Sequence, residues 1–416
     1  MLTLQPRHRL DIRLRHFAYA LLAAAWARSP ERLSARVEAG WSPGGPALAC
    51  RSVRSGFHLL LDSLALPAGS EVLVSAVTHP DMVRILDAHG LVAVPVDLDV
   101  ATLAPRLELA DRLVTPRTAA ILVAHLFGGR VAMGPLAAFA ERHRLLLWED
   151  CAQAFSGARG GDSSADVTMY SFGALKTCTA LGGALIDVKD SSLLARMRAA
   201  HGRWPLQGRG DFAVSVLKFL VFMLVTRPLP YGVLAALHRA LGRDFDRTIN
   251  SSVKAFRPGR LLPQLEVRPS APLLATLSYR LQTFDDARLR RRAAAGEWLT
   301  AELPGGLTLA GHRMESRTHW LFPVISREPD QLILACRSAG VDAARGASSV
   351  TVVPAPVDRP EADPAAARQM MAGLVFLPAY PELSRVSLTR LVAAVGGAAS
   401  ELQDQPEARP GRVLQS

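Results

Sequence analysis

Lys176 stands in a stretch of small and apolar residues, which is an unusual place for a surface charge. It follows the segment YSFGAL and precedes TCTALGG, and neither segment contains another charged residue. Lysines are seldom buried without a reason. Burial lowers the pKa of a lysine and turns it into a nucleophile that can attack a carbonyl carbon. If Lys176 is considered alone, the simpler interpretation is a loop lysine whose ammonium group reaches solvent. The surrounding residues must distinguish between the two interpretations.

Two acids, Glu149 and Asp150, end an apolar run that reads LLLW. The run is typical of a buried parallel strand, and the acids alone could be loop residues or a helix cap. His79, His125 and Ser171 end or follow other apolar runs in the same way. Ligands gather at the carboxyl ends of strands in open parallel sheets. We therefore expect these side chains to meet at one edge of a sheet.

Strand and helix patterns alternate from about residue 71 to residue 188, which predicts a parallel α/β sheet. Strands are expected at 71–77, 91–98, 119–128, 145–150, 167–172 and 182–188, and helices at 81–90, 135–144 and 272–303. We predict an N-terminal helical segment (1–50), a large α/β domain (51–284), a small C-terminal α+β domain (285–400) and a flexible tail (401–416). The large domain has a mostly parallel central sheet flanked by helices. No internal repeat is present in the sequence.

A lysine that binds pyridoxal phosphate needs three supports. A carboxylate keeps the pyridine nitrogen protonated, a group covers the ring face, and backbone amides at a helix N-terminus, with hydroxyl groups, bind the phosphate. Asp150 can supply the carboxylate, and His79 can stack on the ring. Residues 55–57 are expected to open a helix and offer free N–H groups. The residues expected to bind the phosphate are Ser55, Gly56, Phe57 and Ser171.

The order of the motifs SG, TH, HLFG, EDCAQAF, YSFGALK and GGAL resembles the DegT/DnrJ/EryC1/StrS family of sugar aminotransferases. These enzymes use pyridoxal phosphate and have fold type I. The similarity covers residues 55–202 well and resumes more weakly at 268–292 and 376–384. It implies that Lys176 is the Schiff-base lysine and proton carrier, that Asp150 pairs with the ring nitrogen, and that Gln153 contacts the oxygen side of the ring.

The resemblance also implies a function. The expected reaction transfers an amino group, from glutamate, to a keto-sugar that is carried on a nucleotide, in polysaccharide or secondary-metabolite biosynthesis. The family's sites are completed by a neighbouring subunit, so a homodimer is expected. Three features depart from the family: Phe57 replaces a threonine, the loop after Lys176 is short, and Glu266 falls where an asparagine is usual. The alternative is a catalytically idle relative that acts as a membrane-proximal partner in cell-surface polysaccharide assembly.

Composition limits the ligands and the compartment. The net charge of +11 suits anionic ligands or a membrane surface. No basic stretch is interleaved with aromatic residues, so nucleic acid is not an expected partner. The four cysteines, Cys50, Cys151, Cys178 and Cys336, have no paired or metal-ligand spacing. This pattern predicts reduced thiols in the cytoplasm and no metal site.

An apolar insertion occupies residues 213–242. Its apolar stretch from Leu217 to Val225, in which Lys218 is the one charge, is too short to span a bilayer, and Arg227-Pro228 separates it from the apolar residues at 229–237. Buried packing or an oligomer contact is the first interpretation of this segment. Peripheral contact with a membrane is the second, and both stay open at this point.

Overall fold

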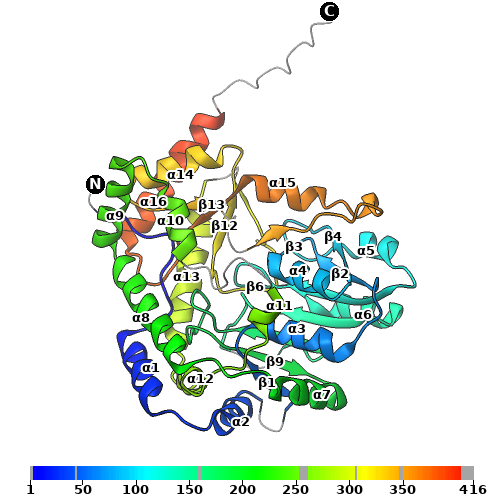
Figure 1. Cartoon of the computed structure of the whole chain (residues 1–416). Coiled ribbons are helices and arrows are strands. Elements are labelled where there is room, and N and C mark those ends of the chain that lie inside the picture. The colour runs from blue at the N-terminus through cyan, green and yellow to red at the C-terminus, as the bar shows by residue number, and fades with distance from the viewer. Residues whose placement is uncertain are drawn as a thin grey trace, which may run out of the picture.

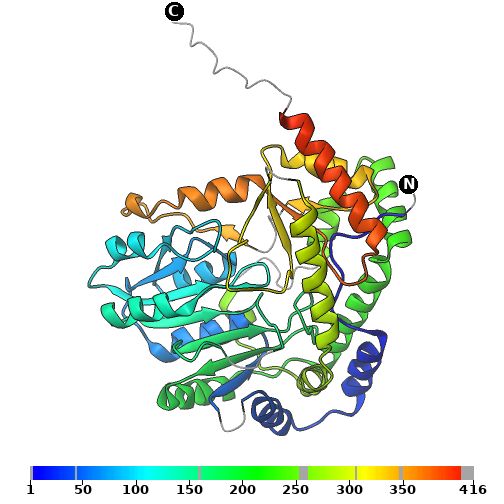
Figure 2. The same cartoon turned by 180° about the vertical axis from the view of Figure 1, so that it is seen from behind.

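The computed structural model describes residues 3–42, 45–157, 161–252, 261–304, 307–345 and 350–403. Figures 1 and 2 show a large twisted sheet with helices on both faces, and a smaller sheet packed beside it. The large sheet has the strand order β1-β9-β8-β7-β5-β2-β4. Its strands are β1 (Ala47–Cys50), β9 (Ala184–Val188), β8 (Val167–Ser171), β7 (Leu146–Asp150), β5 (Thr118–Ala124), β2 (Glu71–Ser75) and β4 (Val92–Val96).

The large sheet is parallel from β4 through β8, and β9 and β1 add two antiparallel pairings at one side. Every residue of β2 is buried, because helices cover both faces of the sheet. One face carries α3 (Val53–Leu64), α4 (Pro80–Ala88) and α7 (Ser191–Gly202). The other carries α5 (Leu107–Leu113), α6 (Met133–His143), α2 (Pro30–Trp41) and α12 (Ala271–Gln282). The predicted fold class of the large domain is confirmed.

The smaller, antiparallel sheet has the order β10-β12-β15-β13. It consists of β10 (Thr308–Leu309), β12 (Phe322–Ile325), β15 (Leu374–Leu377) and β13 (Ala344–Arg345), with α13 (Asp286–Glu302), α14 (Pro329–Ser338) and α16 (Arg385–Gln403) packed on it. α15 (Ala365–Gly373) and the short 3₁₀ helix η1 (Pro360–Ala362) complete this part. Two short strand pairs join it to the large domain: β3 (Val77–Thr78) with β14 (Thr351–Val352), and β6 (Gly129–Arg130) with β11 (Ser316–Arg317).

The N-terminal segment and the apolar insertion lie together along one side of the molecule (Figure 1). α1 (Leu14–Trp26) packs against α12 and against α8 (Arg209–Val225). α9 (Pro228–Ala240) follows α8, and α10 (Phe245–Ser252) and α11 (Leu261–Leu265) lead back to α12. Among the described residues, no single helix has the length and apolarity to cross a membrane. α8 and α9 have the required length and apolarity only when they are taken together, and they meet at a bend of 87°.

Two expectations about helices need correction. The predicted helix 272–303 is two helices, because α12 ends at Gln282 and α13 begins at Asp286. The side chain of Asp285 caps α13 by accepting a hydrogen bond from the amide of Arg288. The first residues of the predicted tail, 401–403, belong to α16, and residues 404–416 lie outside the described part of the chain. The domain limits stay a prediction.

Candidate active site

The polar residues that follow the strands converge at the carboxyl edge of the large sheet, as the strand pattern predicts. Asp150 ends β7, Ser171 ends β8, and His125 comes directly after β5. The amide of His125 donates to the carbonyl of Asp150 over 3.0 Å, so the ends of β5 and β7 are directly linked. His79 follows β3 and caps α4. This edge is where parallel sheets bind ligands.

Lys176 lies in a tight turn after β8, in which its amide donates to the carbonyl of Gly173 over 2.9 Å. Its Nζ lies 4.4 Å from the centre of the Trp320 ring, so the small domain covers the ammonium group. Burial lowers the pKa of Lys176 to about 8; Asp150 opposes this shift, and the nearby charge of Arg54 adds to it. Roughly a quarter of the lysine is therefore neutral near physiological pH.

Asp150 is buried at the end of its strand. One carboxylate oxygen accepts the amide of Ala152 over 2.9 Å. Burial raises the pKa of Asp150 above its usual range, although this hydrogen bond and Lys176 act in the opposite direction. Within the described residues the carboxylate has no ion pair. Lys176 is close enough to lower the pKa of Asp150 but forms no ion pair with it, so this buried acid can still take a cationic partner.

Glu149, the neighbouring acid, has its bonding capacity filled. His125 Nε2 and Thr168 Oγ1 each lie 2.8 Å from one of its oxygens, and Arg130 forms an ion pair with it. Burial would raise the pKa of Glu149, but the hydrogen bond and charge of His125, together with Arg130, lower it to about 2. His125, Glu149 and Cys151 are close enough to hold a metal ion. The oxygens of Glu149 are already used as acceptors, so this acid holds β7 in place.

His79 and Gln153 are each held in a defined orientation by a backbone amide. His79 Nδ1 accepts the amide of Asp81 over 3.1 Å. Burial, together with the charge of Arg54, lowers the pKa of His79 to about 4, so its ring is neutral at physiological pH. Gln153 Oε1 accepts the amide of Phe127 over 2.9 Å, which fixes the side-chain amide.

The expected helix opening at Ser55, Gly56 and Phe57 is wrong, because α3 begins at Val53 and Ser52 caps it. The amide of Ser55 donates to Ser52 Oγ over 3.1 Å, and the amide of Gly56 donates to the Ser52 carbonyl over 3.0 Å. Phe57 is fully buried in the core. These three residues therefore lie within the first turns of the helix and do not offer free N–H groups to a phosphate.

Gly56 is explained by packing. A Cβ atom at this position would lie 2.5 Å from Ile186 Cδ1 of β9, so only glycine allows α3 to approach the sheet this closely. The N-terminal end of α3 is formed by Ser52, Val53 and Arg54. Sequence reasoning missed this end of the helix. The signal that could have found it is Ser52 followed by a polar residue, Ser55, three positions later and then an apolar run.

Arg54 brings a cation to this helix end. Its guanidinium lies 2.7 Å from Asp81 Oδ2, and burial lowers the pKa of Arg54. Its charge also lowers the pKa values of Lys176 and His79. Arg54 therefore lies near both side chains, on the side of the site where α3 begins. Sequence reasoning did not include it.

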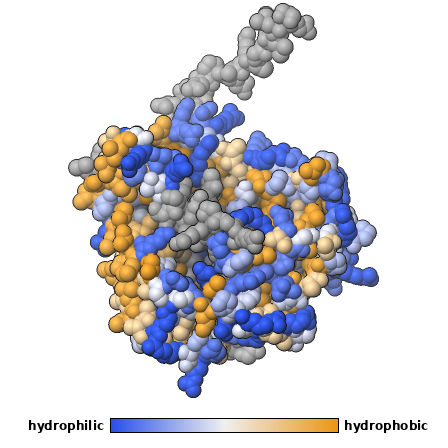
Figure 3. Space-filling model, in the orientation of Figure 1, coloured by the Kyte–Doolittle hydropathy of each residue, from blue (hydrophilic) through white to orange (hydrophobic). Residues whose placement is uncertain are grey.

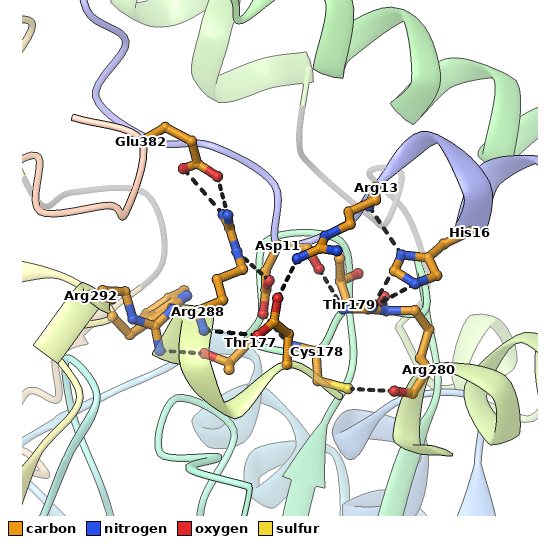
Figure 4. A network of polar contacts seen from close by, with 12 residues as sticks. Asp11, Arg13, His16, Thr177, Cys178, Thr179, Arg280, Arg288, Arg292 and Glu382 are labelled. Carbon is orange, nitrogen blue, oxygen red and sulfur yellow. Dashed lines mark hydrogen bonds and ion pairs between the residues drawn. The ribbon is translucent and has the colours of Figure 1, made fainter. Parts of the chain in front are cut away.

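The N-terminal segment and the loop after Lys176 are joined by a network of polar contacts that the sequence did not predict (Figure 4). The carboxylate of Asp11 accepts the amide of Cys178 over 2.7 Å and the Nε of Arg288 over 2.8 Å. Arg280 donates to the carbonyl oxygens of Thr179 and Asp11, over 2.8 Å and 2.6 Å. The residues that come after the lysine are thus anchored to α12, α13 and the N-terminal segment.

Two buried polar atoms without partners belong to residues that neighbour Trp320 in space or His79 in sequence. Within the described residues, His8 Nε2 and Thr78 Oγ1 have no hydrogen-bond partner. The His8 ring packs edge-on against Trp320, at 6.1 Å between ring centres, and Thr78 directly precedes His79. Buried polar groups in proteins are nearly always satisfied.

The site and the fold agree with the comparison to known proteins. Residues 44–210 match the DegT/DnrJ/EryC1/StrS aminotransferase family. The resemblance predicted from the motifs is confirmed. The matched segment contains the sheet, the acid pair and Lys176.

Individual relatives are similar over part or all of the chain. GDP-perosamine synthase of Caulobacter vibrioides is 31% identical over 201 residues, which are 47% of this chain and 54% of that protein. The chain thus spans about half the length of the curated relatives it matches. The crystal structure of the sugar aminotransferase CalS13 from Micromonospora echinospora covers 94% of this chain and 99% of its own, with a TM-score of 0.68 and 21% identity. The crystal structure of NtdA from Bacillus subtilis, with bound cofactor PMP, covers 94% of this chain and 83% of its own, with a TM-score of 0.66 and 15% identity.

The residues present fit pyridoxal phosphate. A lysine with a lowered pKa can react with the aldehyde, and the buried Asp150 carboxylate beside it suits a protonated ring nitrogen. A neutral His79 can lie against the ring, since a charged imidazole would be repelled by the same proton. The helix end at Ser52 and the charge of Arg54 suit the phosphate.

Proposed function

We propose that this chain is a pyridoxal phosphate-dependent aminotransferase that moves an amino group from glutamate to a keto-sugar carried on a nucleotide. The observation that carries the proposal is the pairing of a buried, partly neutral Lys176 with a buried acid, Asp150, at one sheet edge. The name of the Caulobacter relative, a GDP-perosamine synthase, supports the nucleotide-linked substrate. Polysaccharide or secondary-metabolite biosynthesis is the expected setting.

The cofactor, when bound, supplies an electron sink for negative charge that develops on the substrate carbon. Lys176 does the proton transfer. With a pKa of about 8, its Nζ can accept a proton from that carbon and return it near neutral pH. Asp150 would hold the proton on the ring nitrogen, because a buried carboxylate strongly favours a cation beside it.

The phosphate would be held at the start of α3, by Ser52 and the guanidinium of Arg54, with Ser171 as a further hydroxyl donor. This proposal replaces the one based on residues 55–57, whose amides are used inside the helix. His79 would cover the ring, and Gln153 would contact its oxygen side. Trp320 closes the site from the small domain and excludes water from the lysine.

The idle-relative alternative is less well supported. A protein without catalytic function gains no benefit from a buried lysine whose charge is destabilised by its surroundings. We further propose a homodimer and a cytoplasmic location, on the family resemblance and on the four free, buried cysteines.

Visible absorption tests the proposal directly. The purified protein is mixed with pyridoxal phosphate, and its spectrum is recorded before and after glutamate or, separately, glutamine is added. We expect a visible band from the lysine-bound cofactor that the amino donor converts to the amine form. Lys176→Ala should abolish the band, whereas the matched control Lys218→Ala on exposed α8 should not. A wild-type protein that forms no band would make the idle relative the better account.

A further inference from the structure

α8 is apolar on both of its sides. Phe212, Val216 and Phe219 are buried against α1 and α12. The opposite side exposes apolar residues at a spacing of three or four: Val214, Leu217, Val221 and Leu224. A helix that is apolar all round normally lies in a protein core or in lipid. One side of α8 lies in the protein core, and its other side faces outward.

The exposed side of α8 continues onto its neighbours. Arg209 at the start of α8 donates to the carbonyls of Ala24 and Ala25 at the end of α1, over 2.6 Å and 2.7 Å, so the two helices form one unit. We call the exposed residues of the three helices the apolar face: Leu14, Leu22, Trp26, Val214, Leu217, Val221, Leu224, Leu229, Val233 and Leu237. In Figure 3 it is the orange band on the side where α1, α8 and α9 lie. Contiguous exposed apolar surface of this kind marks an interaction site.

The charges around the apolar face are almost all positive. Between residues 203 and 243 the only acid is Asp211. Exposed basic residues of the same helices and their ends are Arg13, Arg15, Arg28, Lys218, Arg227, Arg239 and Arg243, and an exposed acid, Asp244, follows the last of them. An apolar side with a basic border is the composition of helices that lie in the interface of anionic membranes.

We propose that the apolar face docks the protein onto a membrane surface that contains anionic lipids, with α8 and α9 lying in the interface and not crossing it. Crossing is incompatible with the structure, because the inner sides of α8 and α9 are buried against the protein and the two helices meet at 87°. A second copy of the chain fits the face less well. A twofold contact would place two basic borders against each other, and such like charges repel.

Docking would also connect the membrane to the site. The cluster beneath α8 includes Leu181 and packs against Ala174 and Leu175, which precede Lys176 in the chain. The apolar face therefore backs directly onto the loop that carries the lysine. The inference does not depend on the proposed reaction, and its test requires no activity.

Vesicle flotation of the purified full-length chain is the experiment. Vesicles are made of phosphatidylcholine alone or with phosphatidylglycerol. We expect the protein to float with the anionic vesicles and to be released as salt is raised. Leu217→Ser with Val221→Ser should weaken partitioning by at least about tenfold, because each buried aliphatic side chain contributes about that factor. Arg227→Gln and Arg239→Gln should each weaken it by about fivefold on anionic vesicles only.

The controls are exposed apolar residues elsewhere: Leu334→Ser on α14 and Val386→Ser on α16 should leave binding unchanged. Circular dichroism of each variant confirms that it is folded. Wild-type protein that does not float with anionic vesicles overturns the proposal. The proposal is also overturned if the variant with Leu217→Ser and Val221→Ser binds anionic vesicles within about twofold of the wild type. If the pair instead turns an oligomer into a monomer in light scattering, a second copy covers the apolar face.

Discussion

The lowered pKa of Lys176 predicts how fast this residue reacts with an aldehyde at each pH. Burial moves the pKa from 10.5 to about 8. At a pH of about 7.5 roughly a quarter of such lysines are neutral, against about one in a thousand at the ordinary value. Because only the neutral amine attacks, the reaction should be more than about a hundredfold faster than that of a lysine in water.

The assay is covalent labelling by pyridoxal phosphate with cyanoborohydride, which fixes the product, followed by peptide mass spectrometry. The chain has only four lysines, Lys176, Lys189, Lys218 and Lys254, so each site is read separately. The labelling rate of Lys176 should rise with pH and level off just above about 8. Exposed Lys218 is the internal reference, and its rate should continue to rise beyond that point.

A second measurement checks the same pKa without any cofactor. The folded protein disfavours the charged lysine, and the unfolded chain does not. Between about pH 8 and 10.5 the unfolded state binds the extra proton, so this group makes the protein more stable as pH rises through that window. Lys176→Met should therefore increase the free energy of unfolding at neutral pH by about 1–3 kcal/mol. A labelling rate that tracks the ordinary lysine value, together with a destabilised Lys176→Met protein, would refute the reasoning.

Three further substitutions test the surroundings of the lysine. Asp150→Asn should weaken pyridoxal phosphate affinity at least about tenfold in equilibrium dialysis, because the ring proton loses its anion, while leaving the unfolding midpoint in urea near that of the wild type. Gly56→Ala should cost about 1–3 kcal/mol of stability in urea titration, since its Cβ would lie 2.5 Å from Ile186; an unchanged stability with weaker cofactor binding would instead return Gly56 to the phosphate. Asp11→Asn should cost about 1–3 kcal/mol, because it removes one of the two anions of Arg288, leaving only Glu382, and weakens the acceptor of the Cys178 amide. The low pKa of the Asp11 carboxyl further predicts that its contribution is lost as pH falls below about 4, which Asp11→Asn should abolish in the pH profile of unfolding.

The large domain could be predicted because its signals are local. Each central strand is a short apolar run, and each run is followed by a helix pattern or a polar end. Asp150 and Ser171 end adjacent parallel strands, so the sheet alone brings them together. The small α+β domain could also be predicted, because a helical pattern at 331–340, which corresponds to α14, lies between apolar runs. The break between Gln282 and Asp286 was not, because the helical pattern continues across it.

The features that sequence reasoning missed depend on contacts between distant segments. Asp11 and Cys178 are separated by 167 residues, and nothing in either neighbourhood predicts their hydrogen bond. The contact of Trp320 with Lys176 was missed for the same reason, because the two residues are far apart in the sequence. The start of α3 was missed because Ser55-Gly56 resembles a phosphate-binding pair, whereas the packing of Gly56 on Ile186 is the reason that glycine is required. A short motif can thus be present for a reason that only the tertiary structure shows.

In the proposed phosphate site, Arg54 would connect the cofactor's phosphate to the reactivity of the lysine. Its charge helps to keep Lys176 neutral and His79 neutral, and it lies at the helix end where the phosphate is proposed to bind. A bound phosphate would offset that charge, and the proton affinity of Lys176 would then rise. On this proposal the free protein would hold a lysine that is ready to attack the aldehyde, and binding would convert it into a better proton acceptor for the transfer step. By linkage, the same coupling makes phosphate affinity depend on the protonation of Lys176. Arg54→Met should therefore both raise the labelling midpoint of Lys176 and weaken inorganic phosphate binding, whereas a passive structural arginine would change neither.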